Sequence, residues 1–180
     1  MGSIFCIEGD MMKTKKCLNE WNATVEALGS GKQSVLIRSY DTNVDSEFLL
    51  YPTYSYANRK EVPGCFRDEF KEFVDDNLLP ERDGEKTLVK YYAKVVETSA
   101  KTISRIGTVN KFHIWTRDHV VSHMERKKPY VWLLRVYKLD KPVMLKRSRG
   151  MTWATVDKDV ELKGTPVISD KEFENIKDSL

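Results

Sequence analysis

The chain has 180 residues, 41% of them hydrophobic and 32% charged, with a formal net charge of +3 at pH 7. A chain of this length can bury a core without support from a metal or a disulfide, and its mixed charges exclude wholesale disorder. The three cysteines are irregularly spaced and fit neither a disulfide framework nor a paired-cysteine metal site. No apolar run approaches the roughly 18 residues that span a bilayer. We therefore expect a cytoplasmic protein without a membrane segment.

The first half of the chain predicts two helices and a hairpin. We expect residues 1–12 to form a flexible leader, and residues 13–180 to form a single α+β domain. Apolar residues at three- and four-residue intervals predict an amphipathic helix over 13–28, which a glycine-bearing turn ends. Apolar runs over 34–40 and 48–54 predict a hairpin with a long loop, and a helix follows over 64–79.

The second half is richer in strand signals. Clear alternation predicts a strand over 86–97, and a short strand over 112–115 leads into a helix over 117–127 that Thr116 can cap. The nearly continuous apolar run 130–139 predicts a strand covered on both faces. A strand over 151–156 and a helix over 170–180 close the chain. Together the elements predict a mixed or antiparallel sheet of five or more strands that curls toward a barrel, flanked by three to four helices.

Positive charge is concentrated between residues 101 and 150. This segment holds 13 basic and 3 acidic side chains, a net charge of +10, with aromatic residues between them. Such a surface suits a nucleic-acid backbone and unpaired bases, whereas a solvated face and a complemented helix dipole are the alternatives. The candidate nucleic-acid-binding residues are Arg126, Lys127, Lys128, Arg135, Lys146, Arg147 and Arg149.

The histidines and carboxylates give weaker signals. His119 and His123 stand four residues apart on a predicted helix, but no glutamate follows the first, so the zinc-protease motif is absent. We expect no metal site and no cofactor. A metal-dependent nuclease carries acids on strands near a cation, and the loose candidates are Asp45 or Glu47 with Arg38, or Glu97 with Lys94.

Arg38 and Arg135 each lie within a strongly apolar run. A buried arginine must reach the rim of the sheet or find a carboxylate partner. The functional alternative is that both arginines line a groove that grips an anion or phosphate.

Several segments resemble an uncharacterised archaeal and bacterial family, domain of unknown function 1802. The resemblance is carried by residues 20–21, 25–28, 35–38, 48–53, 114–116 and 133–137, with Leu139 and Pro142. The chain departs from the family pattern after Arg38, where Ser39-Tyr40-Asp41 replaces a lysine and paired glycines, and after Thr53, where Tyr54-Ser55-Tyr56 replaces His-Gln. The family has no established activity, so the resemblance implies one-domain architecture and cellular location rather than a function.

Three residues shared with that pattern permit a further expectation. If the predicted helix over 13–28 packs on the first two strands, Glu26, Arg38 and Thr53 converge on one polar pocket. The alternative is that Glu26 and Arg38 form a structural ion pair that fixes the register between helix and sheet.

The leading hypothesis is a non-catalytic module that binds RNA or DNA through the 101–150 surface, on a fold analogous to small RNA-binding β-barrels such as the PUA type. A second hypothesis is a metal-dependent phosphodiesterase or nuclease. A third is an interaction module that docks an acidic protein partner. The sequence does not indicate an oligomeric state.

Overall fold

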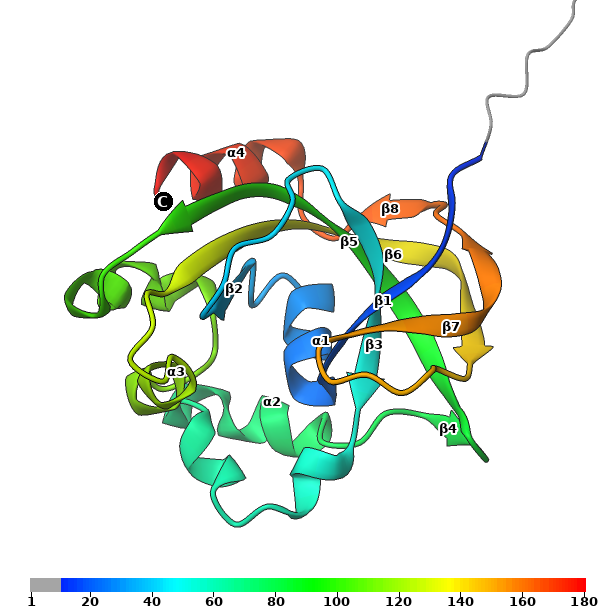
Figure 1. Cartoon of the computed structure of the whole chain (residues 1–180), viewed down its shortest axis with the longest axis horizontal. Helices are drawn as coiled ribbons and strands as arrows, with labels where there is room; N and C mark the ends of the chain where they lie inside the picture. The colour runs from blue at the N-terminus through cyan, green and yellow to red at the C-terminus, as the bar shows by residue number, and fades with distance from the viewer. Residues whose placement is uncertain (1–10) are drawn as a thin grey trace, which may run out of the picture.

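The computed structural model describes residues 11–180, whose strands all belong to one sheet. The strands run in the order β2-β6-β5-β3-β1-β7, with β4 paired to β5 and β8 paired to β6. The sheet curves strongly but does not close into a barrel (Figure 1). The strands are β1 (Lys13–Trp21), β2 (Val35–Arg38), β3 (Glu47–Thr53), β4 (Arg82–Asp83), β5 (Lys86–Ala100), β6 (Tyr130–Leu145), β7 (Trp153–Glu161) and β8 (Gly164–Pro166).

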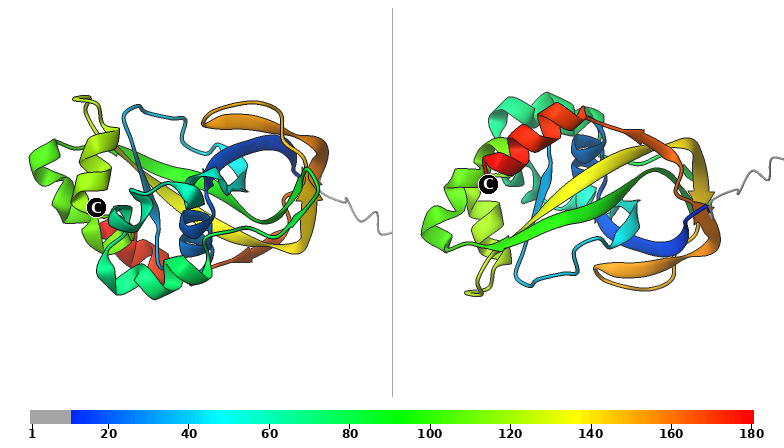
Figure 2. Two further views of the ribbon diagram at one scale, coloured as in Figure 1. Left: turned by 90° about the horizontal axis from the view of Figure 1, so that it is seen from below. Right: turned by 90° about the horizontal axis from the view of Figure 1, so that it is seen from above.

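The helices lie inside and around the curve of the sheet. Figure 1 shows α1 enclosed by the strands, and nearly all of its side chains are buried there. Figure 2 shows α4 and the segment around α3 outside this curve, toward one end of the molecule. The helical segments are α1 (Asn22–Gly29), η1 (Ser55–Asn58), η2 (Val62–Cys65), η3 (Asp68–Phe70), α2 (Lys71–Asp76), η4 (Ile103–Phe112), α3 (Arg117–His123) and α4 (Asp170–Asp178).

The prediction of a single helix over 13–28 is wrong in its first half. Residues Lys13–Trp21 form β1, and the helix begins only at Asn22. The strand is stabilised on both edges, because β1 pairs in parallel with β3 and antiparallel with β7. Cys17 and Leu18 are both buried, on opposite faces of the sheet. A strand covered on both faces carries adjacent apolar residues instead of alternating ones, and this pattern resembles that of a helix.

The predicted hairpin between 34–40 and 48–54 is also wrong, although both strands exist. β2 pairs with β6, whereas β3 lies between β1 and β5. The short strand expected over 112–115 is reduced to one isolated bridge between Phe66 and Trp115, and the residues before it form η4. The alternating strand is confirmed as β5, and it pairs along most of its length with the long apolar strand β6.

The sheet and helices bury two apolar clusters. The larger packs α1 against β2, β3, β5 and β6, and the smaller lies on the opposite side of the sheet around Leu49, Val89 and Leu145. No helix within residues 11–180 is long and apolar enough to cross a membrane. Residues 1–10 of the expected leader lie outside the described residues; Met11 and Met12 are exposed.

Candidate nucleic-acid interface

The basic residues predicted to form one surface occupy three places. Arg126, Lys127 and Lys128 are exposed beyond the end of α3, which stops before the predicted 127 because Glu125 and Arg126 take left-handed φ angles of 47° and 65°. Lys146, Arg147 and Arg149 lie between β6 and β7. Arg135 lies inside β6 and is only 6% exposed.

Arg135 does not belong to an exposed basic surface. Its Nη2 donates to Asp170 Oδ1 at 2.6 Å, its Nη1 donates to the Ser169 carbonyl at 3.3 Å, and its guanidinium lies over the Phe173 ring. Arg135 is therefore paired with a carboxylate, as expected for a structural role rather than for a groove that binds an anion. The pair holds the start of α4 against the sheet.

The 146–149 segment instead forms a basic pocket with residues from distant parts of the chain. This pocket, the arginine groove, has a volume of about 560 Å³. Among the described residues, Arg82, Arg147 and Arg149 have no carboxylate partner, while Lys146 Nζ donates to Glu85 Oε2 at 2.5 Å. The groove is lined by Tyr51, Pro52, Thr53, Tyr54, Ser55, Arg82, Glu85, Thr87 and the segment 146–149.

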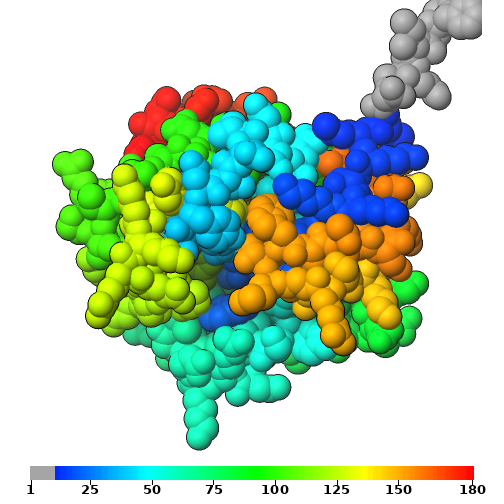
Figure 3. All heavy atoms as spheres, viewed as in Figure 1, coloured from blue at the N-terminus to red at the C-terminus, as the bar shows by residue number. Residues whose placement is uncertain are grey.

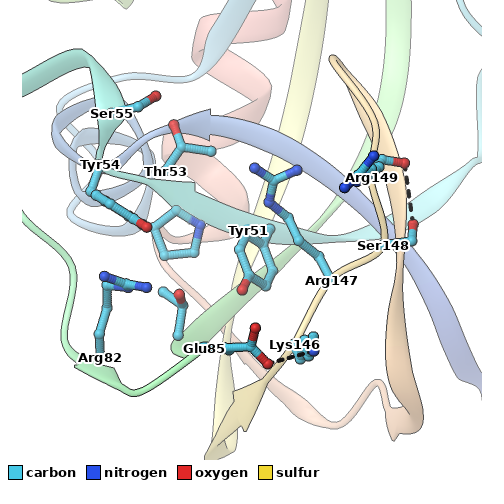
Figure 4. Close-up of a pocket in the computed structure, with 12 residues that line it drawn as sticks. Tyr51, Thr53, Tyr54, Ser55, Arg82, Glu85, Lys146, Arg147, Ser148 and Arg149 are labelled. Atoms are coloured by element: carbon cyan, nitrogen blue, oxygen red, sulfur yellow. Dashed lines mark hydrogen bonds and ion pairs between the residues drawn. The ribbon is translucent and has the colours of Figure 1, made fainter.

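Tyrosine rings and one ion pair position the cations of the groove. The Arg82 guanidinium lies 3.9 Å from the centroid of the Tyr54 ring, and that of Arg147 lies 5.6 Å from the Tyr51 ring. Figure 4 shows Arg147 pointing past Tyr51 into the pocket, with Arg82 and Tyr54 on the facing wall. The hydrogen bond to Glu85 raises the pKa of Lys146 and lowers that of the carboxyl. Three arginines thus remain available to an anion.

A second pocket, the aromatic cleft, lies on the other side of the segment 149–152. It has a volume of about 380 Å³, and Figure 3 shows a hollow on this face between the α3 region, the segment after β2 and the start of β7. Arg149 lines the groove, whereas Met151 and Thr152 line the cleft. The cleft is lined by Glu20, Trp21, the segment 37–40, Arg59, Trp115, His119, Val120, residues 123–125, Met151 and Thr152.

The expected convergence of Glu26, Arg38 and Thr53 is not what the structure contains. Glu26 pairs with Lys90 and accepts a hydrogen bond from the Tyr91 hydroxyl. Arg38 Nη2 instead donates to Glu20 Oε2 at 2.5 Å, and Thr53 Oγ1 donates to the Glu20 carbonyl at 3.1 Å. The prediction named the wrong glutamate, because it placed residue 20 on a helix rather than on β1.

Both histidines of α3 line the cleft, His119 half-buried and His123 exposed. The His119 ring centroid lies 5.1 Å from that of Trp21 and 4.3 Å from that of His123. Burial lowers the pKa of His119 to about 3, with smaller contributions from His123 and Arg38, so this imidazole is neutral at pH 7. His123 Nδ1 lies 3.1 Å from the His119 carbonyl and must donate to it, which leaves Nε2 as an acceptor when the ring is neutral.

The third histidine is buried behind the cleft. His113 is 1% exposed, and burial lowers its pKa to about 4, helped by the nearby Arg67. Its Nδ1 accepts from the Trp115 backbone N–H at 3.1 Å, which fixes the ring proton on Nε2.

Of the residues predicted for a nuclease site, two acids lie beside a lysine, but the expected arginine does not. Lys94 pairs with Asp45 at 3.2 Å and stands opposite Glu47 in the ladder between β3 and β5. Arg38, the cation expected beside them, pairs with Glu20 instead. Within residues 11–180 no group of three or more histidine, cysteine, aspartate or glutamate side chains is arranged to hold a metal ion.

Comparison with known proteins identifies the family. The protein-family model described as "Domain of unknown function (DUF1802)" matches residues 17–179. The chain belongs to this family. The resemblance noted in the sequence is therefore confirmed for the DUF1802 protein over nearly its whole length.

Solved structures similar to this DUF1802 chain include those of an ASCH protein of Zymomonas mobilis. The ASCH structure is 13% identical and covers 92% of this chain and 94% of its own, with a TM-score of 0.47. One mutant of that protein is 11% identical, with a TM-score of 0.47, and covers 93% of this chain and 98% of its own. Another mutant is 12% identical, with a TM-score of 0.45, and covers 71% of this chain and 73% of its own. No curated protein matches the chain.

Proposed function

We propose that this DUF1802 protein is a cytoplasmic module that binds RNA or DNA, with the arginine groove holding the phosphate backbone. The observation that carries the proposal is the convergence of Arg82, Arg147 and Arg149 on one pocket, without carboxylate partners among the described residues. Guanidinium groups bind phosphate oxygens in bidentate geometry, and neutralising several phosphates releases condensed counterions.

The surroundings of the groove support a strand rather than a single anion. The segment 149–152 separates the groove from the aromatic cleft, and Glu125, which lines the far side of that cleft, directly precedes the exposed Arg126–Lys128 cluster. We therefore expect one bound strand to run from the groove across the cleft toward this second predicted basic cluster. A chain of phosphates spaced along such a track can contact both clusters.

Fluorescence anisotropy with labelled single- and double-stranded RNA and DNA at two salt concentrations tests the proposal. We expect binding that weakens as salt rises, and a weaker, less salt-dependent affinity for the variant Arg147→Glu/Arg149→Glu. The control Lys111→Glu/Lys171→Glu makes the same charge change at exposed positions outside both pockets and leaves affinity within about twofold. Absence of binding at low salt, or equal losses in both variants, overturns the proposed function.

The test also addresses catalysis. The oligonucleotides are incubated with and without Mg²⁺ and then checked for length. Intact oligonucleotide supports the binding module, while cleavage that requires the metal overturns the non-catalytic part of the proposal in favour of a metal-dependent nuclease.

A further inference from the structure

We infer that the aromatic cleft receives an unpaired nucleobase, so that the protein binds single-stranded nucleic acid with a base in the cleft and flanking phosphates in the arginine groove. This inference rests on the proposed function and adds the class of nucleic acid and the position of the base.

The composition of the cleft differs from that of the groove in a way that suits a base. The rings of Trp21, Tyr40, Trp115, His119 and His123 line one concave site, with a volume within the roughly 300–1,000 Å³ typical of small-molecule sites. Aromatic side chains are the usual platform on which unpaired bases stack, because every base has a π-face. Tyr40 is 38% exposed and can offer its ring without rearrangement of the core.

Charge divides the two pockets. In the cleft, Arg38 is paired with Glu20, and the remaining charged side chains, Arg59 and Glu125, have opposite signs. His119 is neutral at pH 7 because its pKa is lowered by burial. The groove, in contrast, holds three arginines without carboxylate partners among the described residues. A phosphate is therefore attracted to the groove, while the cleft offers rings and hydrogen-bonding groups to an uncharged, planar group.

One buried donor in the cleft wall lacks an acceptor. Trp115 is 4% exposed, and its indole Nε1 has no hydrogen-bond partner among the described residues. A buried N–H without a partner is uncommon and costs about 1–3 kcal/mol. Because this nitrogen is itself buried, a ring nitrogen or carbonyl oxygen of a base accepts from it only after a neighbouring side chain of the cleft shifts.

The segment 149–152, which contributes Arg149 to the groove and Met151 and Thr152 to the cleft, is held in place by β1. Asn19 Nδ2 donates to the carbonyls of Gly150 and Met151 at 3.2 and 3.3 Å, and the Asn19 backbone N–H donates to the Thr152 carbonyl at 2.8 Å. Met151 is nevertheless 96% exposed. The backbone is thus fixed while an apolar side chain projects into solvent at the mouth of the cleft, where it can cover one face of a bound base.

Heteronuclear NMR with free nucleosides tests the cleft separately from the groove, because nucleosides carry no phosphate. The protein has four tryptophans, whose indole N–H signals are assigned with single Trp→Phe variants. We expect at least one of adenosine, guanosine, cytidine and uridine to shift the Trp21 and Trp115 signals saturably, and to leave that of Trp153 unmoved. Shifts confined to Trp153, or no saturable shift with any nucleoside, overturn the inference.

Variants at the edge of the cleft keep the test independent of folding. Tyr40→Ala and His123→Ala change exposed side chains, and we expect each to weaken nucleoside and single-strand binding by about fivefold or more. Leu79→Ala, a truncation of a 65% exposed residue outside both pockets, leaves binding unchanged. Equal effects of all three variants, or tighter binding of duplex than of single strand, would contradict the placement of a base.

The groove variant separates the two proposals. We expect Arg147→Glu/Arg149→Glu to reduce oligonucleotide affinity while nucleoside shifts persist. Oligonucleotide binding that survives without any nucleoside binding refutes the base site and leaves the proposed function standing. Nucleoside binding without oligonucleotide binding refutes the proposed function, and the placement of a strand with it.

Discussion

Glu20 joins the sheet to the aromatic cleft through Arg38, with 2.5 Å between Glu20 Oε2 and Arg38 Nη2. The second carboxylate oxygen, Oε1, accepts from the Trp21 backbone N–H at 2.8 Å, at the point where β1 ends and α1 begins. One side chain thus neutralises the cleft arginine and orders the backbone that carries the cleft tryptophan. The Glu20 side chain is 9% exposed and that of Arg38 is 19% exposed.

Glu20→Gln is expected to lower the free energy of unfolding by about 2–4 kcal/mol. The substitution keeps the shape of the side chain but leaves the largely buried Arg38 charge without its partner. Urea denaturation followed by circular dichroism measures the change. Asp68→Asn removes a partner from the exposed pair with Lys71, whose atoms lie 3.9 Å apart, and should cost less than about 0.5 kcal/mol. Similar losses in both variants would show that the buried pair contributes no more than a surface pair.

Stability is expected to fall as the pH drops below about 6.5. Burial lowers the pKa of His113 to about 4 and that of His119 to about 3, whereas both titrate near 6.5 when unfolded. Between these pKa values the unfolded chain binds more protons than the folded chain. Each histidine therefore lowers the free energy of unfolding by about 1 kcal/mol per pH unit as the pH falls, and neither contributes a pH dependence above pH 7.5. Thermal melts between pH 7.5 and 5 measure the slope. His113→Gln and His119→Gln should each flatten it, and an unchanged slope in both variants would contradict the assignment.

Arg135 is expected to act on α4 and not on nucleic acid. Arg135→Met keeps an unbranched apolar stem but is shorter, and it removes the contacts to Asp170 and to the Ser169 carbonyl. Hydrogen exchange measured by mass spectrometry should become faster in 170–178, because the start of α4 is no longer held to β6. Oligonucleotide affinity at fixed salt should change by less than about twofold. If Arg135→Met lost as much oligonucleotide affinity as Arg147→Glu/Arg149→Glu, Arg135 would belong to the nucleic-acid-binding residues after all.

Elements with a complete local signal were predicted correctly. The alternation in 86–97 and the apolar run from 130 reappear as β5 and β6, Thr116 Oγ1 accepts from the His119 N–H at the start of α3, and the closing helix is α4. The wrong predictions concern segments whose secondary structure depends on pairing with strands distant in the sequence. Residues 13–21 become a strand because β3 and β7 pair with both of its edges, and no pattern within those residues reveals this pairing.

The candidate site was predicted in part for the same reason. Charge density located Arg147 and Arg149. It could not show that Arg82 joins them from β4, or that Arg135 meets a carboxylate 35 residues further along. The aromatic cleft was missed because it takes Trp21 from β1, Arg38 from β2 and His119 from α3. Only the i, i+4 histidines gave a local signal, which we weighed as a possible metal site and set aside because the zinc-protease glutamate is absent.

Gly150 lies between Arg149, which lines the groove, and Met151, which lines the cleft, and a substitution there tests whether the two pockets act together. A Cβ atom at this position would lie 2.2 Å from the Trp153 carbonyl oxygen, so Gly150→Ala must displace the backbone between the groove and the cleft. The Gly150 carbonyl also accepts from Arg147 Nη1 and Asn19 Nδ2, both at 3.2 Å, and the displacement therefore moves a groove arginine. We expect a fivefold or greater loss of single-strand affinity, measured by anisotropy.

The matched control is Gly64→Ala, because an added Cβ at Gly64 meets nothing within 4 Å. We expect this variant to keep both its affinity and its unfolding midpoint. Gly150→Ala should retain a cooperative unfolding transition, since the segment 149–152 lies on the surface and contributes little to the two apolar clusters. Unchanged affinity in a folded Gly150→Ala protein would mean that this segment can shift without disturbing either pocket, so that groove and cleft do not act on one bound strand.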